Sequence, residues 1–200
     1  MVADEELMRE WQRGGAGALE ALVQRHHAPL LAHLARLVGD VHLAEDLCQD
    51  VFVKLVREGR TYRYPRPFKP WFYTIARHCA RNHWQSAYYR HEEVNMDAAS
   101  AERGGDDPDP AVWFEHLDRQ DGLRAALTVL SFAQREVLSL RFGQELSVEE
   151  TAAVVGVPSG TIKSRTFTAL RRLRERLEQL QQDKRTSERT DRRQGDHHHG

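Results

Sequence analysis

Cations and aromatic rings are concentrated together in residues 59–91. This window contains no Asp or Glu, although the 200 residues of the chain carry 30 acids against 29 Lys and Arg. Its cations are Arg60, Arg63, Arg66, Lys69, Arg77, Arg81 and Arg90, and nine of the chain's sixteen aromatic residues lie among them. Cationic side chains neutralise phosphates and aromatic rings stack on unpaired bases. The combination is typical of a protein that binds single-stranded or melting DNA.

Some of these rings have an alternative role in a hydrophobic core. Phe72, Ile75 and Cys79 follow helical spacing and are predicted to be buried, whereas Trp71 is open to either role. The rings predicted to contact bases are those that a loop or a polar helical face presents: Tyr62, Tyr64 and Trp84.

A sharp turn near residue 156 introduces a second group of polar and basic residues. Ser147 and Glu150 have the spacing of a capping box, which predicts the start of a helix. Gly156 can adopt the left-handed conformation that ends this helix, and Pro158 prevents its continuation. Ser159 can then cap the next helix. Two helices joined by so short a turn form a helix-turn-helix.

The second helix of this motif has an apolar stripe and a polar, cationic face. The residues predicted to point outward are Thr161, Lys163, Ser164, Arg165, Thr168, Arg171 and Arg172, and Phe167 offers an apolar surface to a thymine methyl. Such a face supplies donors for base edges and positive charge for phosphates. A basic helix can also be merely a solvated face, but the capped helix and turn before it favour DNA binding.

A third candidate surface lies on the helix predicted over 41–59. Its outward residues are Glu45, Asp46, Gln49, Asp50 and the apolar Val53. An acidic face with an apolar residue suits a protein partner that bears arginines. An ordinary solvated helix explains the same pattern equally well.

Helical patterns position all of these groups. Apolar residues recur at helical spacing over 19–38, where Pro29 can introduce a bend, over 41–59 and over about 71–89. Four further patterns cover about 112–130, 132–142, 148–155 and 161–180, and Ser131 with Gln134 has capping-box spacing. No strand-like alternation and no internal repeat is found. The predicted class is all-α, with two small helical domains joined by a flexible acidic linker.

The predicted domain boundaries follow changes in composition. The first domain covers residues 1–91, an acidic linker rich in Gly and Pro covers 92–111, and the second domain covers 112–180. Residues 181–200 lack apolar periodicity and are predicted to be a disordered tail.

Composition also limits the compartment and the chemistry. Cys48 and Cys79 lie in helical apolar patterns and are too few for a secreted disulfide scaffold. The acidic N-terminus is unlike a signal peptide and no apolar run approaches a membrane span, so we expect a cytoplasmic protein without membrane insertion. Cys79 and His83 can share a metal, but a core cysteine beside a surface histidine is the favoured interpretation. We predict no catalytic, cofactor or metal site.

Three stretches of the chain resemble a known family in their order and spacing. They are AEDLCQDVFVKL, PFKPWFYTIAR and LSFAQREVLSLRFGQELSVEETAAVVGVPSGTIKSR. The family is the sigma-70 family of bacterial transcription initiation factors, and its small extracytoplasmic-function (group IV) branch in particular. The resemblance spans most of the chain from about Leu19 to Leu177. It implies a region-two helical domain followed by a region-four helix-turn-helix domain.

The resemblance also implies three sets of site residues. The segment expected to dock on the clamp coiled coil of RNA polymerase is Asp46, Gln49, Asp50, Val51, Phe52 and Val53. The residues expected to recognise and open the minus-ten element are Tyr62, Arg63, Tyr64, Phe68, Lys69, Arg77, Arg81, Asn82 and Trp84. The residues expected to read the minus-thirty-five element are Ser159, Thr161, Lys163, Ser164, Arg165, Phe167, Thr168, Arg171 and Arg172.

The function implied by the resemblance is that of a sigma factor, not an enzyme. Its expected partners are core RNA polymerase through the clamp coiled coil and the flap, promoter DNA in double-stranded and melted form, and an anti-sigma factor. The acidic linker is expected to thread toward the RNA path of the polymerase. The alternative is a stand-alone helix-turn-helix regulator that binds duplex DNA without polymerase and uses its first domain for ligand sensing or dimerisation.

Overall fold

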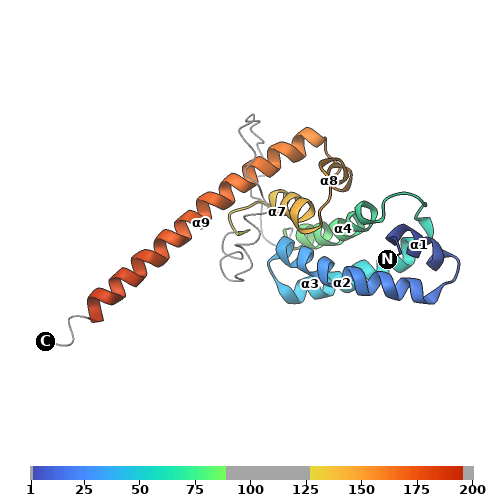
Figure 1. Cartoon of the computed structure of the whole chain (residues 1–200), viewed down its shortest axis with the longest axis horizontal. Helices are drawn as coiled ribbons and strands as arrows, with labels where there is room; N and C mark the ends of the chain where they lie inside the picture. Colours follow the sequence, from blue (N-terminus) through green and yellow to red (C-terminus); the bar gives the residue numbers. More distant parts are fainter. Residues whose placement is uncertain (1, 89–126, 196–200) are drawn as a thin grey trace.

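Figure 1 shows a computed structural model of the chain. It describes the backbone of residues 2–88 and 127–195, and the side chains of residues 2–83, 127–180 and 182. The described ranges contain helices, turns and no strand, which confirms the predicted all-α class. The predicted acidic linker and most of the helix predicted over 112–130 lie outside the described residues.

Residues 2–88 form four α-helices and one 3-10 turn. They are α1 (Asp4–Gln12), α2 (Ala16–Val38), α3 (Val41–Glu58), η1 (Gly59–Thr61) and α4 (Phe68–Tyr88). Gly39 ends α2 with φ of 77°, and the Asp40 carboxylate then caps α3 by accepting a hydrogen bond from the amide of Leu43 at 3.1 Å. The helix α4 begins earlier than the predicted residue 71, because Pro70 is tolerated within a first helical turn.

The second half follows with α7 (Phe132–Leu138), η2 (Ser139–Gly143), α8 (Val148–Val155) and α9 (Ser159–Gly195). Both predicted capping boxes are present, Ser131 with Gln134 at the start of α7 and Ser147 with Glu150 at the start of α8. The single helix predicted over 132–142 instead changes at Ser139 into the π-helical turn η2. π-helical turns are uncommon and are often found at functional sites.

The last helix is longer than the sequence predicts. A helix ending near residue 180 and a disordered tail were expected, whereas α9 continues to Gly195 and projects away from the body of the molecule (Figure 1). The structure corrects the expectation over 181–195. Residues 181–194 lack an apolar stripe, but half of them are Gln or Arg and none is Gly or Pro. These residue types favour the helix without needing an apolar face.

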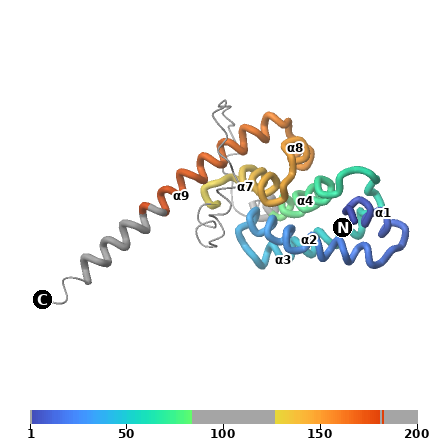
Figure 2. The backbone as a smooth tube through the Cα atoms, in the orientation of Figure 1, coloured from blue at the N-terminus to red at the C-terminus, as the bar shows by residue number. Residues whose placement is uncertain are grey.

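One hydrophobic core continues from the first half into the second. It includes Leu30 and Leu34 of α2, and Phe72 of α4. The same cluster includes Leu140 of η2 and Val154 of α8. In Figure 2 the tube of α4 lies beside that of α8, and these two helices are in contact. A second, smaller cluster joins α7 to α9 through buried Leu138, Ala169 and Leu173, among others. Phe72, Ile75 and Cys79 are buried, as predicted.

Candidate nucleic-acid and protein-binding surfaces

The predicted helix-turn-helix is formed by α8, the turn after it and the start of α9. The Ser147 hydroxyl accepts a hydrogen bond from the Glu150 amide at 3.1 Å, and Glu150 Oε2 accepts from the Ser147 amide at 2.8 Å. Gly156 ends α8 with φ of 74° and ψ of 35°, a left-handed backbone conformation that residues other than glycine rarely adopt. The chain then enters α9 at Ser159, so the turn consists of residues 156–158.

The first turns of α9 combine a buried stripe with a cationic face. The buried residues of the stripe are Ile162, Ala169 and Leu173, and Leu177 and Leu180 are half-buried. The exposed cations are Lys163, Arg171 and Arg172. The half-buried residues predicted to read DNA are Ser159, Thr161, Ser164, Arg165, Phe167 and Thr168. The amphipathic pattern predicted for this helix is therefore present, with positive charge on its accessible side.

The segment between η1 and α4 exposes cations and one ring. The exposed residues of the predicted minus-ten set are Arg63 and Tyr64 in this segment and Lys69 in the first turn of α4. Tyr64 is 45% exposed, and the guanidinium carbon of Arg9 lies 5.0 Å from its ring centroid. Guanidinium groups stack favourably on aromatic faces, so Arg9 of α1 adds a cation to this surface that the sequence analysis did not identify.

Two other rings of the predicted minus-ten set, one in this segment and one at the start of α4, are buried, which corrects the expectation that they contact DNA. Tyr62 is 4% exposed and Phe68 is fully buried. The Tyr62 hydroxyl donates to the carbonyl of Arg66, and its ring meets Trp71 edge-on with centroids 5.1 Å apart. Burial, together with the nearby charge of Glu5, raises the pKa of Tyr62 to about 12. Tyr62 and Phe68 therefore support the loop from inside.

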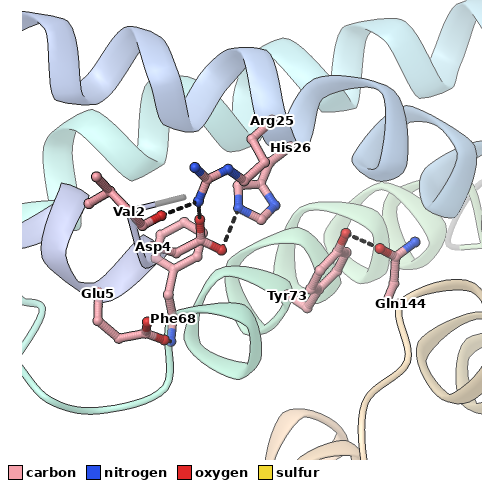
Figure 3. Close-up of polar contacts among 8 residues, drawn as sticks. All are labelled: Val2, Asp4, Glu5, Arg25, His26, Phe68, Tyr73 and Gln144. Atoms are coloured by element: carbon pink, nitrogen blue, oxygen red, sulfur yellow. Dashed lines mark hydrogen bonds and ion pairs between the residues drawn. The ribbon is translucent and has the colours of Figure 1, made fainter.

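Helix α1 holds this loop in place through polar contacts. Gln12 Nε2 donates to the carbonyls of Gly59 and Tyr62, each at 2.8 Å. Glu5 Oε1 accepts from the amide of Phe68 at 2.8 Å and so caps the start of α4, as Figure 3 shows. These contacts join residues about fifty positions apart, so helical periodicity gave no signal of them.

The N-terminal end of α1 is fixed to α2 by a partly buried polar cluster. The Asp4 carboxylate accepts from Arg25 and lies 2.9 Å from His26 Nε2 (Figure 3). Burial alone raises the pKa of Asp4, but the hydrogen bonds and charges of His26 and Arg25 outweigh this effect and lower it. Asp4 is therefore held as a carboxylate, and α1 is anchored at both ends.

The outer face of α4 continues the cationic surface. Arg81 and Asn82 are exposed, whereas the side chain of Arg77 is only 15% exposed. Arg77 Nε lies 3.0 Å from Glu136 Oε1 of α7, an ion pair whose geometry is not that of an aligned hydrogen bond. The side chain of Trp84 lies outside the described residues. The structure therefore separates the predicted minus-ten residues into accessible and covered ones.

Helix α3 presents the predicted acidic face. Its exposed residues are Glu45, Asp46, Gln49, Asp50 and Val53, and the last of these is 48% exposed. Val51 is fully buried and Phe52 is half-buried, with the His27 ring stacked on it at 6.2 Å. Val51 therefore supports this face from the core and is not part of the surface. Val41 and Val56 are 43% and 46% exposed and enlarge the apolar part of the face.

Polar contacts also cross between the two halves. His33 Nδ1 of α2 lies 2.8 Å from the Ser139 hydroxyl of η2. The Tyr73 hydroxyl of α4 donates to Gln144 Oε1, which Figure 3 shows, and Gln144 Nε2 donates to the Pro29 carbonyl at 3.1 Å. None of these contacts was foreseen, because each joins residues that are more than seventy positions apart.

Other kinds of site find little support within the described residues. No three His, Cys, Asp or Glu side chains gather there in an arrangement that could hold a metal ion. Cys79 is buried, and burial raises the pKa of its thiol. No helix in the described ranges combines the length and apolar character that a membrane crossing requires.

Both halves match family models. Residues 22–88 match the model described as Sigma-70 region 2, and residues 126–175 match the one described as Sigma-70, region 4. These two matches cover more than half of the chain and stand in the order expected from the sequence. The helix α1, which braces the loop, precedes the first of them.

Curated relatives align with most of the chain. It is 34% identical over 172 residues to the ECF RNA polymerase sigma factor BldN of Streptomyces coelicolor, covering 84% of this chain and 63% of BldN. It is 32% identical over 179 residues to the RNA polymerase sigma factor CarQ of Myxococcus xanthus, covering 87% of this chain and 97% of CarQ. Over 180 residues it is 32% identical to the ECF RNA polymerase sigma-E factor of Escherichia coli K12, covering 84% of this chain and 91% of that factor.

Two solved structures have a similar fold. CnrH in complex with the cytosolic domain of CnrY aligns with a TM-score of 0.64 at 25% identity, covering 88% of this chain and 98% of CnrH. RpoE in complex with the anti-sigma factor NepR, from Bartonella quintana, aligns with a TM-score of 0.63 at 27% identity, covering 80% of this chain and 96% of RpoE.

Proposed function

The chain belongs to the sigma-70 family and is a sigma factor of its extracytoplasmic-function branch, and we propose that its surfaces divide polymerase docking, strand opening and duplex reading among α3, α4 and α9. A sigma factor binds core RNA polymerase and directs it to particular promoters. The assignments below concern which residues perform each task.

The observation that carries this proposal is the separation of three surfaces with different chemistry. The acidic and apolar face belongs to α3, the cationic loop and helix face belong to α4, and the cationic face behind a capped turn belongs to α9. The first two lie within the region-two match and the third lies within the region-four match. Each surface has the chemistry of a different partner of a sigma factor.

The face of α3 is assigned to the polymerase. Its exposed residues Asp46, Gln49 and Asp50 suit a partner that carries arginines, and Val53 supplies apolar area at the centre of the contact. The clamp coiled coil is the proposed partner. The second half of the chain is proposed to contact the flap.

The loop and α4 are assigned to the opened strand. Arg63, Lys69 and Arg81 are accessible for the phosphate backbone, and Tyr64 is the accessible ring for an unpaired base. Asn82 is exposed and can form hydrogen bonds with a base edge. On α9, Lys163 and Arg171 are accessible for the duplex of the upstream element.

The alternative of a stand-alone helix-turn-helix regulator is not favoured. That alternative requires a ligand-sensing or dimerisation module in the first half, whereas residues 22–88 match sigma-70 region 2. We further propose that the chain has no catalytic activity and acts in the cytoplasm, beside the polymerase. An anti-sigma factor is the proposed inhibitor, since the similar RpoE was solved in complex with the anti-sigma factor NepR.

The proposal is tested by transcription in vitro with core RNA polymerase on a promoter library. Adding the chain will create start sites that core polymerase alone does not use. Replacing Asp46→Arg and Asp50→Arg together will weaken polymerase binding at least about tenfold, because like charges then oppose each other across the interface. Circular dichroism will show unchanged helicity.

A double charge reversal elsewhere provides the matched control. Glu6 on α1 and Glu20 on α2 are exposed and lie outside both the docking face and the second half, so Glu6→Arg with Glu20→Arg will leave polymerase affinity within about twofold. Equal polymerase affinity of the two double variants would refute the docking assignment. Unchanged start sites with the wild-type chain would refute the whole proposal and favour a regulator that works alone.

A further inference from the structure

Helix α1 contacts the segment of residues 59–68 along one stripe of its surface. Glu5, Arg9 and Gln12 are separated by four and three residues, the spacing that places side chains on one helical face. Each of them contacts a different part of the segment; the groups contacted are the amide of Phe68, the ring of Tyr64, and the carbonyls of Gly59 and Tyr62. Both ends of this segment and its exposed ring are therefore in contact with α1.

Apolar packing fixes the distance between α1 and the segment. Met8 is fully buried, and Trp11 packs against the main core. A Cβ added at Gly59 would lie 2.2 Å from Cζ3 of Trp11, so the backbone at the start of the segment passes directly against the indole. The segment has no room to move closer to α1 here, and the two hydrogen bonds of Gln12 oppose its moving away.

Helix α1 is in turn fixed to α2. Asp4 accepts a hydrogen bond from Arg25 and contacts His26, whose ring centroid lies 5.0 Å from that of Phe68. The position of the segment is thus determined by α1 and α2 together. Helix α1 nevertheless precedes residues 22–88, which match the region-two model.

Arg9 makes the contact of this stripe that bears on DNA. Arg9 is exposed, and its guanidinium carbon lies 5.0 Å from the ring centroid of Tyr64, which is itself 45% exposed. A guanidinium over an aromatic face is attracted to the ring and restricts its orientation. The part of the ring that stays exposed can stack on an unpaired base.

Building on the proposed function, we propose that Arg9 is a positioning residue for strand opening, which holds the Tyr64 ring in the orientation that receives an unpaired base. Glu5 and Gln12 set the position of the backbone, and Arg9 sets the orientation of the accessible ring. A ring that is already oriented loses less conformational freedom when a base stacks on it, so the strand binds more tightly. Helix α1 then belongs to the strand-binding site.

The test measures strand binding by the holoenzyme, formed from core RNA polymerase and the full chain. The probe is a fluorescein-labelled single strand with the non-template sequence of a promoter that the wild-type chain selects, and fluorescence anisotropy gives the affinity. Arg9→Ala will weaken binding about threefold, as expected for loss of an exposed cation–π contact. Tyr64→Ala will weaken it at least about fivefold, the lower end for loss of one stacked base.

The double variant distinguishes positioning from a direct phosphate contact by Arg9. If Arg9 acts through the ring, Arg9→Ala will change the affinity by less than about 1.5-fold once Tyr64→Ala is present. An equal effect of Arg9→Ala with and without the Tyr64 ring would overturn the proposal, because Arg9 would then contact the strand independently.

Arg13→Ala is the matched control, because it removes the same charge from an exposed residue one turn farther along, at the end of α1. It will leave the affinity within about 1.5-fold. Equal losses for Arg9→Ala and Arg13→Ala would refute a specific role for Arg9. Circular dichroism will show unchanged helicity for both variants, since both side chains are exposed.

Arg81→Ala, on α4, tests the proposed function in the same assay. If Arg81→Ala and Tyr64→Ala weaken strand binding and Arg9→Ala does not, the positioning role of Arg9 is refuted and the strand-binding surface of the proposed function stands. If none of the three changes alters strand binding, the proposed surface and the role of Arg9 are refuted together.

Discussion

At the scale of single residues, His33 is a neutral imidazole enclosed by both halves of the molecule. It is 1% exposed, its Nδ1 contacts the Ser139 hydroxyl, and the Tyr73 ring meets it edge-on at 5.1 Å. Burial and the charge of Arg36 lower its pKa from 6.5 to about 3. The interior therefore accepts this ring only in its uncharged form.

This environment makes stability depend on pH in a known direction. Below pH 6.5 the unfolded chain binds a proton at His33 that the folded chain binds only near pH 3. The free energy of unfolding therefore falls as pH decreases through this window, with a slope of up to about 1.4 kcal/mol per pH unit. Urea denaturation at several pH values will give the free energy of unfolding as a function of pH. We expect this free energy to depend less steeply on pH in His33→Asn than in the wild type.

The comparison of variants is needed because Glu136 acts in the opposite direction. Its raised pKa means that the folded chain binds its proton more tightly, so its contribution to stability increases as pH falls. Glu136 is common to wild type and variant and cancels in their difference. His42→Asn, at a side chain that is 95% exposed, is the control. If the free energy of unfolding changed equally with pH in the wild type and in His33→Asn, this account of His33 would be contradicted.

Residue types alone predicted which side chains carry charge but not which rings are accessible. Phe72, Ile75 and Cys79 were correctly predicted as core because they share one helical face. Tyr62 was expected at the surface because a loop was predicted to present it, and Phe68 was expected to contact DNA from the family resemblance. Their burial depends on Trp71 and on α1, which are brought together only by the fold.

At the scale of elements, local signals were the reliable ones. Ser147, Glu150 and Gly156 act on their own neighbours, and the helix-turn-helix was predicted from them with its boundaries nearly correct. The bracing of the loop by Gln12 was missed because its two acceptors, the carbonyls of Gly59 and Tyr62, are far along the chain. The predicted end of α9, near residue 180, was wrong because apolar periodicity was taken as necessary for a helix.

The turn between α8 and α9 allows a test with a control nearby. A Cβ added at Gly156 or at Gly160 would meet nothing within 4 Å, but only Gly156 has a positive φ, of +74°. Gly156→Ala will therefore destabilise the chain by roughly 1–2 kcal/mol through backbone strain. Gly160→Ala, within the first turn of α9, will stabilise it by up to about 1 kcal/mol through helix propensity.

Thermal unfolding followed by circular dichroism will separate these effects. The midpoint will fall for Gly156→Ala and rise or stay constant for Gly160→Ala. If both midpoints rose, the left-handed backbone at Gly156 would not determine what the turn tolerates.

At the scale of the whole molecule, the sequence indicated two halves but not their contact. Helix caps, turns and amphipathic stripes depend on residues that are close in the sequence. They therefore predict the helices of each half but not how the two halves pack together. The shared core places Leu140 and Val154 in the same buried cluster as Phe72, whereas the spacing of each residue within its own helix only indicates that it is buried. The buried pair of Glu136 with Arg77 was unpredictable for the same reason, and Arg77 had been expected to be accessible.

A shared core implies that the halves are energetically coupled. Leu140 of η2 is fully buried in the cluster that spans both halves, whereas Leu173 of α9 is 2% exposed in the cluster of α7 and α9. Truncating either leucine to alanine removes the same atoms and costs about 2–5 kcal/mol. Leu140→Ala will reduce amide protection in α2 and α4 as well as in the second half, because its cavity lies against both. Leu173→Ala will reduce protection mainly in α7 and α9. Hydrogen exchange measured by mass spectrometry distinguishes the two patterns, and losses confined to the second half in both variants would show that the halves are held together without sharing a cooperative core.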